Sequence, residues 1–219
     1  MSRARFAVLA SILCLGLAAR ATAKIDPCNS DCPGLITLVG LGANGGADPL
    51  GTFTVNVRDF NKVPQEDRRV VLDFSGCRDI HLGADQRDPW VTVDCVAQTL
   101  MKLTDVNGQA TFRVVGCAAN QGGSPGSIGP SLQVFADGIL INSSGGCIGS
   151  GVRVAALDQD GGGVGGGDLS LFLADYFSGQ AFARSDYDGN GTIDGNDFSL
   201  WLAAFFAGGS AVGGGAACP

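Results

Sequence analysis

The chain has 219 residues and a formal net charge of −7 at pH 7, with 21 acidic residues against 14 Lys and Arg. Nucleic acids and anionic membrane surfaces are bound by basic patches, so this acidic balance excludes both kinds of partner. Glycine is abundant, at 35 residues, which predicts a chain of short elements joined by tight turns.

Residues 1–23 have the features of a secretory signal peptide. Arg3 and Arg5 precede an apolar stretch from Phe6 to Ala19, and Ala21-Thr22-Ala23 is a small-x-small cleavage sequence. The apolar stretch is shorter than the roughly 20 residues that a membrane helix needs, and no later stretch approaches that length. We therefore expect a secreted or cell-surface protein that has no membrane span after cleavage and a net charge of about −10.

Seven cysteines remain after this cleavage: Cys28, Cys32, Cys77, Cys95, Cys117, Cys147 and Cys218. In an oxidising compartment they are expected to form up to three disulfides. Spacing leaves the pairing open; we favour Cys77 with Cys95 and Cys117 with Cys147, since each pair brackets a loop between predicted strands. Zinc is disfavoured because the chain has no Cys-x-x-Cys and a single histidine, His81.

From residue 34 to 156 the pattern is that of short β-strands. In the stretch 52–58, Phe53, Val55 and Val57 alternate with polar residues, and Asp137-Gly138 is a hairpin signal. Strands are predicted at 35–39, 52–58, 69–74, 98–103, 109–115, 132–136, 139–141 and 152–154. This number of short strands favours an antiparallel β-sandwich.

Two stretches of this region carry a family resemblance. Residues 54–61 read Thr-Val-Asn-Val-Arg-Asp-Phe-Asn, and residues 104–112 read Thr-Asp-Val-Asn-Gly-Gln-Ala-Thr-Phe. They resemble bacterial immunoglobulin-like repeats of the invasin and intimin type, which implies an immunoglobulin-like sandwich over 24–156 that serves in spacing or adhesion. Asn107-Gly108 is expected to form a tight hairpin. The chain departs from the family in a cysteine-containing insert at 76–96 and a Gly/Ser-rich loop at 120–130.

The stretch 186–197 has the layout of a twelve-residue calcium loop. Gly191 stands at position 6, where the chain turns sharply, and Ile193 at position 8 is apolar. The predicted ligands are the side chains at positions 1, 3, 5, 9 and 12 and the backbone carbonyl at position 7, which are Asp186, Asp188, Asn190, Asp194, Asp197 and Thr192. Calcium takes six to eight oxygens, so this set favours Ca²⁺ over an ordinary acidic turn.

A helix is predicted directly after this loop, with Phe198, Trp201, Leu202 and Phe205 on one face. A calcium loop that ends in Asp and has only an exiting helix resembles the type I dockerin repeat. The resemblance implies a dockerin-like, EF-hand-like module over 157–209, followed by a flexible tail over 210–219.

Dockerins have two such repeats, and a degraded copy lies upstream of the loop 186–197. Asp158, Asp160 and Asp168 align with positions 1, 3 and 12, whereas Gly162 and Gly165 replace the ligands at positions 5 and 9. We expect a weaker second metal site here. When Ca²⁺ neutralises the loops, an aromatic core is expected to form from Leu169, Phe172, Tyr176, Phe198, Trp201 and Phe205.

Catalytic signals are missing from the sequence. Glu66 is the one glutamate and lies in a polar turn, and no Gly-x-Ser-x-Gly sequence accompanies His81. We therefore predict a non-catalytic, calcium-binding protein of extracellular or cell-surface structure. One alternative is a cellulosome-type component that docks a cohesin partner, although Gly195 and Asn196 replace the hydroxyl residues by which that family selects its partners. The other is a polysaccharide-acting enzyme, because dockerins often accompany such domains.

Overall fold

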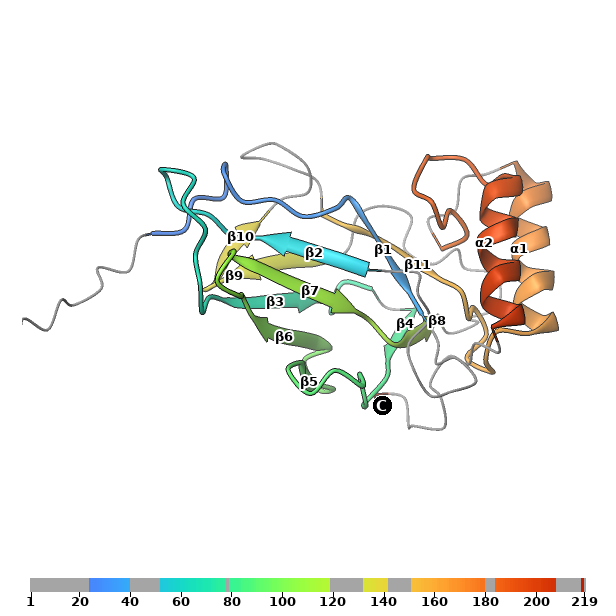
Figure 1. The fold of residues 1–219 in the computed structure, drawn as a ribbon. Coiled ribbons are helices and arrows are strands. Elements are labelled where there is room, and N and C mark those ends of the chain that lie inside the picture. Colours follow the sequence, from blue (N-terminus) through green and yellow to red (C-terminus); the bar gives the residue numbers. More distant parts are fainter. Residues whose placement is uncertain are drawn as a thin grey trace, which may run out of the picture.

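The computed structural model describes residues 24–39, 52–77, 79–118, 132–141, 151–179, 184–207 and 218. The expected signal peptide and all of the predicted tail except Cys218 lie outside the described residues. Within them the chain is mainly β, with two helices at one end (Figure 1).

The elements follow the order of the sequence, with all strands before both helices. Their bounds are β1 Leu35–Leu38, β2 Thr52–Asn56, β3 Arg69–Asp73, β4 Ile80–Leu82, β5 Thr92–Asp94, β6 Thr99–Leu103, β7 Gln109–Arg113, β8 Gly116–Ala118, β9 Gln133–Ala136, β10 Ile139–Ile141, β11 Arg153–Ala156, α1 Gly166–Ser178 and α2 Gly195–Phe206.

The strands form a sandwich-like arrangement. One layer is an antiparallel sheet in the order β10-β9-β3-β6-β5, and β2 and β7 form an antiparallel pair beside it. Leu72 and Leu100 from the sheet and Val55 and Phe112 from the pair belong to one buried cluster, so the two layers share a core. The expected mainly β, sandwich-like fold is therefore present.

Sequence alternation explains these strands. Phe53, Val55 and Val57 are buried while their neighbours are partly exposed, as the period of two predicts. Asp137 and Gly138 both have positive φ and connect β9 to β10, which confirms the predicted hairpin.

The pairing of β1 with β11 differs from the expectation of an antiparallel sandwich. These strands run parallel, in register from Leu35 with Arg153 to Leu38 with Ala156. More than a hundred residues separate them, so the connection is long enough for β11 to return in the same direction as β1.

Three strands were not predicted. β4 and β5 lie in the expected insert 76–96, and β8 follows β7; β4 pairs with β8, and β5 pairs with β6. Each has three residues, which is too short for an alternation to stand out from the surrounding sequence.

The turn at Asn107-Gly108 is not a hairpin, because β6 and β7 belong to different sheets and are not paired. The turn instead carries the chain from one layer to the other. Gly108 has φ +72°, and a Cβ there would lie 2.6 Å from the carbonyl oxygen of Val57. The turn packs so closely against Val57 that only glycine, which has no Cβ, fits at position 108.

Both expected disulfides are wrong. Cys95 bonds to Cys218, which attaches the end of the chain to the β part, and Cys117 is a buried thiol. The amide of Cys218 also donates to the carbonyl of Leu82 at 2.7 Å. Cys95 and Cys218 are 123 residues apart in the sequence. Proximity along the chain, on which the expectation rested, does not decide which cysteines meet in the fold.

A second buried cluster joins the helices to the β part. Val39 and Ala155 contribute from the β1–β11 edge, and Phe172, Tyr187 and Trp201 from the helices and the loop before α2. The two parts of the chain thus share apolar packing at this edge, where both aspartate-rich loops are also found.

Candidate metal centre

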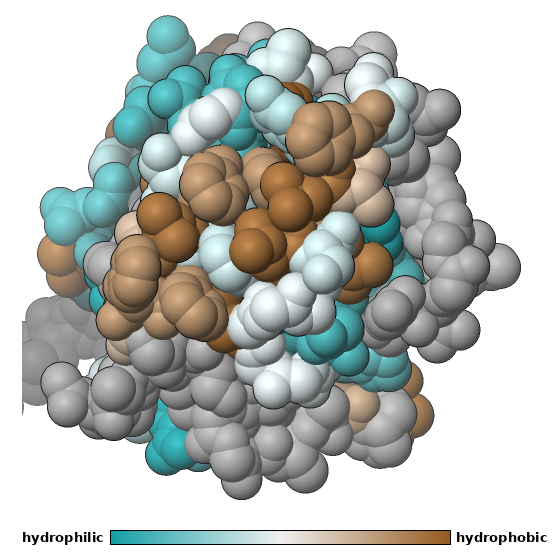
Figure 2. Space-filling model, turned by 90° about the vertical axis from the view of Figure 1, so that its right-hand side faces the viewer, coloured by the Kyte–Doolittle hydropathy of each residue, from teal (hydrophilic) through white to brown (hydrophobic). Residues whose placement is uncertain are grey.

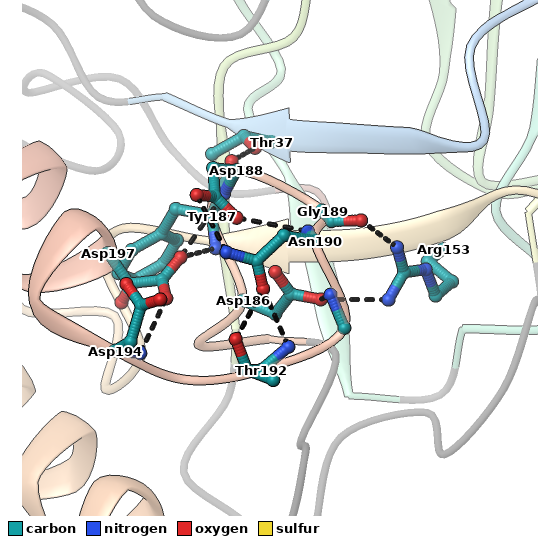
Figure 3. A network of polar contacts seen from close by, with 11 residues as sticks. Thr37, Arg153, Asp186, Tyr187, Asp188, Gly189, Asn190, Thr192, Asp194 and Asp197 are labelled. Atoms are coloured by element: carbon teal, nitrogen blue, oxygen red, sulfur yellow. Dashed lines mark hydrogen bonds and ion pairs between the residues drawn. The ribbon is translucent and has the colours of Figure 1, made fainter.

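The loop 186–197 leads directly into α2 and lies against the β1–β11 edge (Figure 3). Gly189 and Gly191 have φ of +74° and +90°, and so bend the loop back on itself. The hydroxyl of Thr37 in β1 donates to the carbonyl of Tyr187 at 3.3 Å. This bond places the start of the loop beside the sandwich.

Three of the predicted ligands converge in this loop. Asp186, Asp188 and Asp197 each offer a carboxylate oxygen, and these oxygens lie within 4.8 Å of one another. Asp186 and Asp197 are buried, at 1% and 0% exposure, whereas Asp188 is exposed. A divalent cation bound between them would be accessible to solvent on the side of Asp188.

Hydrogen bonds orient the two buried carboxylates. Asp197 Oδ1 accepts from the backbone amides of Tyr187 and Asp188, and its Oδ2 accepts from the amide of Asp194 at 2.8 Å. Asp186 Oδ2 accepts from the amide of Gly191 at 3.0 Å. The backbone thus holds both side chains with their carboxylates at the centre of the loop.

Asp186 Oδ1 is different: it is buried and accepts no hydrogen bond in the part of the chain that the structure describes. A buried carboxylate oxygen without a donor is costly, since it has lost its water and gained nothing. A cation bound among the three carboxylates would remove that cost. The donor set is entirely oxygen, and this suits a hard ion such as Ca²⁺.

The remaining predicted ligands have other contacts. Asn190 Oδ1 accepts from the amide and the hydroxyl of Thr192, and its side-chain amide donates to Asp188 Oδ2 at 3.0 Å. Asp194 is the N-cap of α2, where its carboxylate accepts from the amide of Asn196 at 2.7 Å. Position 9 of calcium loops often reaches the ion through water, and a capping role leaves that route open.

The earlier loop repeats much of this geometry. Asp158, Asp160 and Asp168 also bring carboxylate oxygens within 4.8 Å of one another. Asp168 Oδ1 accepts from the amides of Gln159 and Asp160, and its Oδ2 accepts from Gly165, as Asp197 does in the later loop. The side chains at positions 3 and 12, Asp160 and Asp168, are thus arranged like Asp188 and Asp197 in the later loop.

The two loops differ at position 1. Asp158 Oδ1 accepts from the amides of Asp160 and Gly161, and its Oδ2 accepts from Gly163 at 2.6 Å. Both oxygens of Asp158 are therefore satisfied by the backbone. Asp186 has one oxygen that is not.

Burial is the main influence on the charge of these groups. It raises the pKa of Asp168 to about 6, against hydrogen bonds from Gln159 and Gly165 that lower it, and the nearby charges of Asp158 and Asp160 raise it further. Burial likewise raises the pKa values of Asp158 and Asp197. Each loop therefore holds carboxylates that favour a bound positive charge, whether a proton or a metal ion.

Sequence reasoning missed Arg153. Its guanidinium, from β11, donates to Asp186 Oδ2 and to the carbonyl of Gly189, both at 2.8 Å (Figure 3). It also missed the buried pair of Arg184 with Asp175, in which two nitrogens each lie 3.0 Å from a carboxylate oxygen. Nothing local to Arg153 marks it, because the loop that it contacts lies 33 residues further along.

None of the described helices is both long and apolar enough to cross a membrane. No protein-family model matches this sequence, and comparison with curated proteins and with solved structures finds no similar chain.

Proposed function

We propose that residues 186–197 bind a calcium ion that holds the helices against the β part of an exported, non-catalytic protein. The observation that carries this proposal is the buried Asp186 Oδ1, which lacks a hydrogen-bond donor beside the carboxylates of Asp188 and Asp197. Calcium fits this set because it takes six to eight oxygens, with carboxylates, carbonyls and water together.

The ion would be held by this chain's own residues in the roles expected of a dockerin-like loop. Asp186, Asp188 and Asp197 supply carboxylates, and Asn190 and the carbonyl of Thr192 complete the protein ligands. Asp194 contributes through water while it caps α2. The immunoglobulin-like character of the β part belongs to the same proposal and is supported by the sandwich-like layers.

Disulfide bonding supports the expectation of export. Cys95 is bonded to Cys218, and Cys28 is also disulfide-bonded. Such bonds are stable in oxidising compartments and rare in the cytosol. We therefore place the protein at the cell surface or in extracellular structure. The cohesin partner that the dockerin resemblance implies gains no support, since Gly195 and Asn196 offer no hydroxyl group.

Calcium titration by calorimetry tests the proposal. The chain from residue 24 is expected to bind at least one Ca²⁺, and Asp186→Ala to lose that binding. Asp105→Ala is a matched control, because Asp105 also accepts backbone amides in a turn but belongs to the β6–β7 connection rather than to either loop. At 100 times Kd, bound calcium stabilises the folded state by about 2.7 kcal/mol, so the melting temperature should rise. Equal helicity and melting in chelator and in millimolar Ca²⁺ would contradict the proposal.

The earlier loop is proposed to bind more weakly. The backbone already satisfies Asp158, and Gly162 and Gly165 bring no side-chain oxygen. Asp160→Ala is therefore expected to leave the stronger binding event unchanged in affinity. Loss of the stronger binding event in Asp160→Ala would contradict the proposal, because it would place the stronger site in the earlier loop.

A further inference from the structure

The two helices present an apolar outer face to solvent. Figure 2 views this end of the molecule and shows apolar side chains gathered there. Exposures range from 36% for Phe198 to 78% for Phe177. The residues of this surface, here called the aromatic face, are Leu173, Tyr176, Phe177, Phe198, Phe205 and Phe206.

Charged groups are absent from the helices' exposed sides. The charged residues of α1 and α2 are Asp168, Asp175 and Asp197, and all three are buried. Neither helix contains Lys, Arg or His. The chain as a whole has a net charge of −7, so two copies repel each other electrostatically. That repulsion is weakest at an uncharged surface such as this one.

Packing within the molecule does not account for the outermost aromatic side chains of the two helices. Phe172 and Trp201 fill the cluster beneath the helices. Phe177 and Phe206, in contrast, meet only the neighbouring rings of Tyr176 and Phe205 among the ring contacts of the described residues, edge-on at 5.3 and 5.6 Å. Each helix therefore has, in its last turn, a pair of adjacent aromatic residues, one nearly half-exposed and one about three-quarters exposed.

The area of the aromatic face suits the centre of a protein interface. A large aromatic side chain offers about 150–250 Å², so six residues at these exposures present on the order of 500–600 Å². That is at the upper end of the roughly 300–600 Å² of the largest apolar patch of a typical monomer, and stable interfaces bury roughly 800 Å² on each partner.

The lack of charge distinguishes between kinds of partner. Transient interfaces are about as polar as the rest of a protein surface, whereas the interfaces of homodimers are more apolar and depleted of charge. A two-fold dimer also needs a patch that complements itself, and an uncharged aromatic face meets that requirement without pairing like charges.

We propose that a second copy of this chain docks on the aromatic face and forms a symmetric dimer through α1 and α2. Phe177 and Phe206 would become buried at its centre. The proposal goes beyond calcium binding: calcium is proposed to hold the helices in place, and the dimer would form on their outer face.

Analytical ultracentrifugation of the chain from residue 24, at 1–100 µM in buffer with calcium, tests the dimer. The wild type is expected to sediment as a dimer at the upper concentrations. The double variant Phe177→Ser/Phe206→Ser should weaken dimerisation at least tenfold. Phe60→Ser is the matched control, because Phe60 is exposed to 79% but lies on the β part. Circular dichroism and calcium titration of each variant establish that the helices and the loop are intact.

Three results would overturn the dimer. The first is a wild type that stays monomeric at 100 µM. The second is a dimer that persists in the double variant. The third is an equal loss of dimer in Phe60→Ser. The calcium titration reports separately whether the proposed metal site is intact.

Discussion

Arg153 in β11 forms an ion pair with Asp186, the first residue of the loop 186–197, with 2.8 Å between Nη1 and Oδ2. The second guanidinium nitrogen holds the carbonyl of Gly189. Arg153 therefore restrains the loop at two points. Because Arg153 contacts Oδ2, the other oxygen of Asp186 remains available to a metal ion.

Arg153→Met is expected to lower the free energy of unfolding by about 1–2 kcal/mol in metal-free buffer. The substitution leaves a buried carboxylate without its charged partner, and the 31% exposure of Arg153 places the loss at the low end of such effects. The loss should shrink in saturating calcium, since the ion then neutralises Asp186. Urea denaturation with and without calcium measures both values. Arg113→Met, which removes an exposed arginine from β7, should change neither.

Metal-free stability should fall as the pH rises from about 4 to 7. The pKa of Asp168 is about 6 in the folded chain, against an ordinary value of 3.8, so the folded state binds the proton more tightly. Its contribution is fully present below the unfolded pKa and is lost as the pH rises through 6. Over this window the loss is on the order of 2–3 kcal/mol. Denaturation curves at pH 4, 5, 6 and 7 measure it.

Asp168→Asn should flatten this pH profile, because its side chain carries no titrating proton. If the profile of Asp168→Asn keeps the full slope, another group is responsible.

Gly191→Ala should weaken calcium binding and destabilise the loop by about 1–2 kcal/mol. A Cβ at Gly191 would meet no atom within 4 Å, so the cost comes from φ +90° alone. Gly195→Ala separates this effect from any general effect of the methyl group. Gly195 has equal space around it but begins α2, where alanine is favoured. Equal affinities in the two variants would argue that the sharp turn at position 6 does not matter.

Cys218→Ser should lower the free energy of unfolding by about 2–4 kcal/mol, because the bond to Cys95 closes a long loop in the unfolded chain. Peptide mapping without reduction should recover the Cys95–Cys218 pair.

Cys117, in contrast, should not react with thiol reagents until the chain unfolds. It is buried, and burial together with nearby Asp158 raises its pKa to about 12. Rapid labelling of Cys117 in the folded protein would contradict this.

Local sequence determined the elements whose signals lie within a dozen residues. The alternation at Phe53, Val55 and Val57 gives a strand with one buried face. Asp137-Gly138 sets the turn between β9 and β10 through the positive φ of both residues. The loop 186–197 is local in the same sense: its carboxylates at positions 1, 3 and 12 meet because the glycines bend the chain between them. These features needed no knowledge of the rest of the molecule.

The tertiary structure alone decided what depends on distant residues. It brought Arg153 to Asp186, joined Cys95 to Cys218, and set β1 parallel to β11. It also decided which aromatic residues face solvent. The sequence predicted a shared core that included Tyr176, Phe198 and Phe205, yet these are 44%, 36% and 42% exposed. Tyr176 stacks on Phe172, and Phe198 and Phe205 stack on Trp201, but the β1–β11 edge fills the cluster from the other side. Helical periodicity marks the apolar face of a helix, and only the position of its neighbours determines how much of that face is covered.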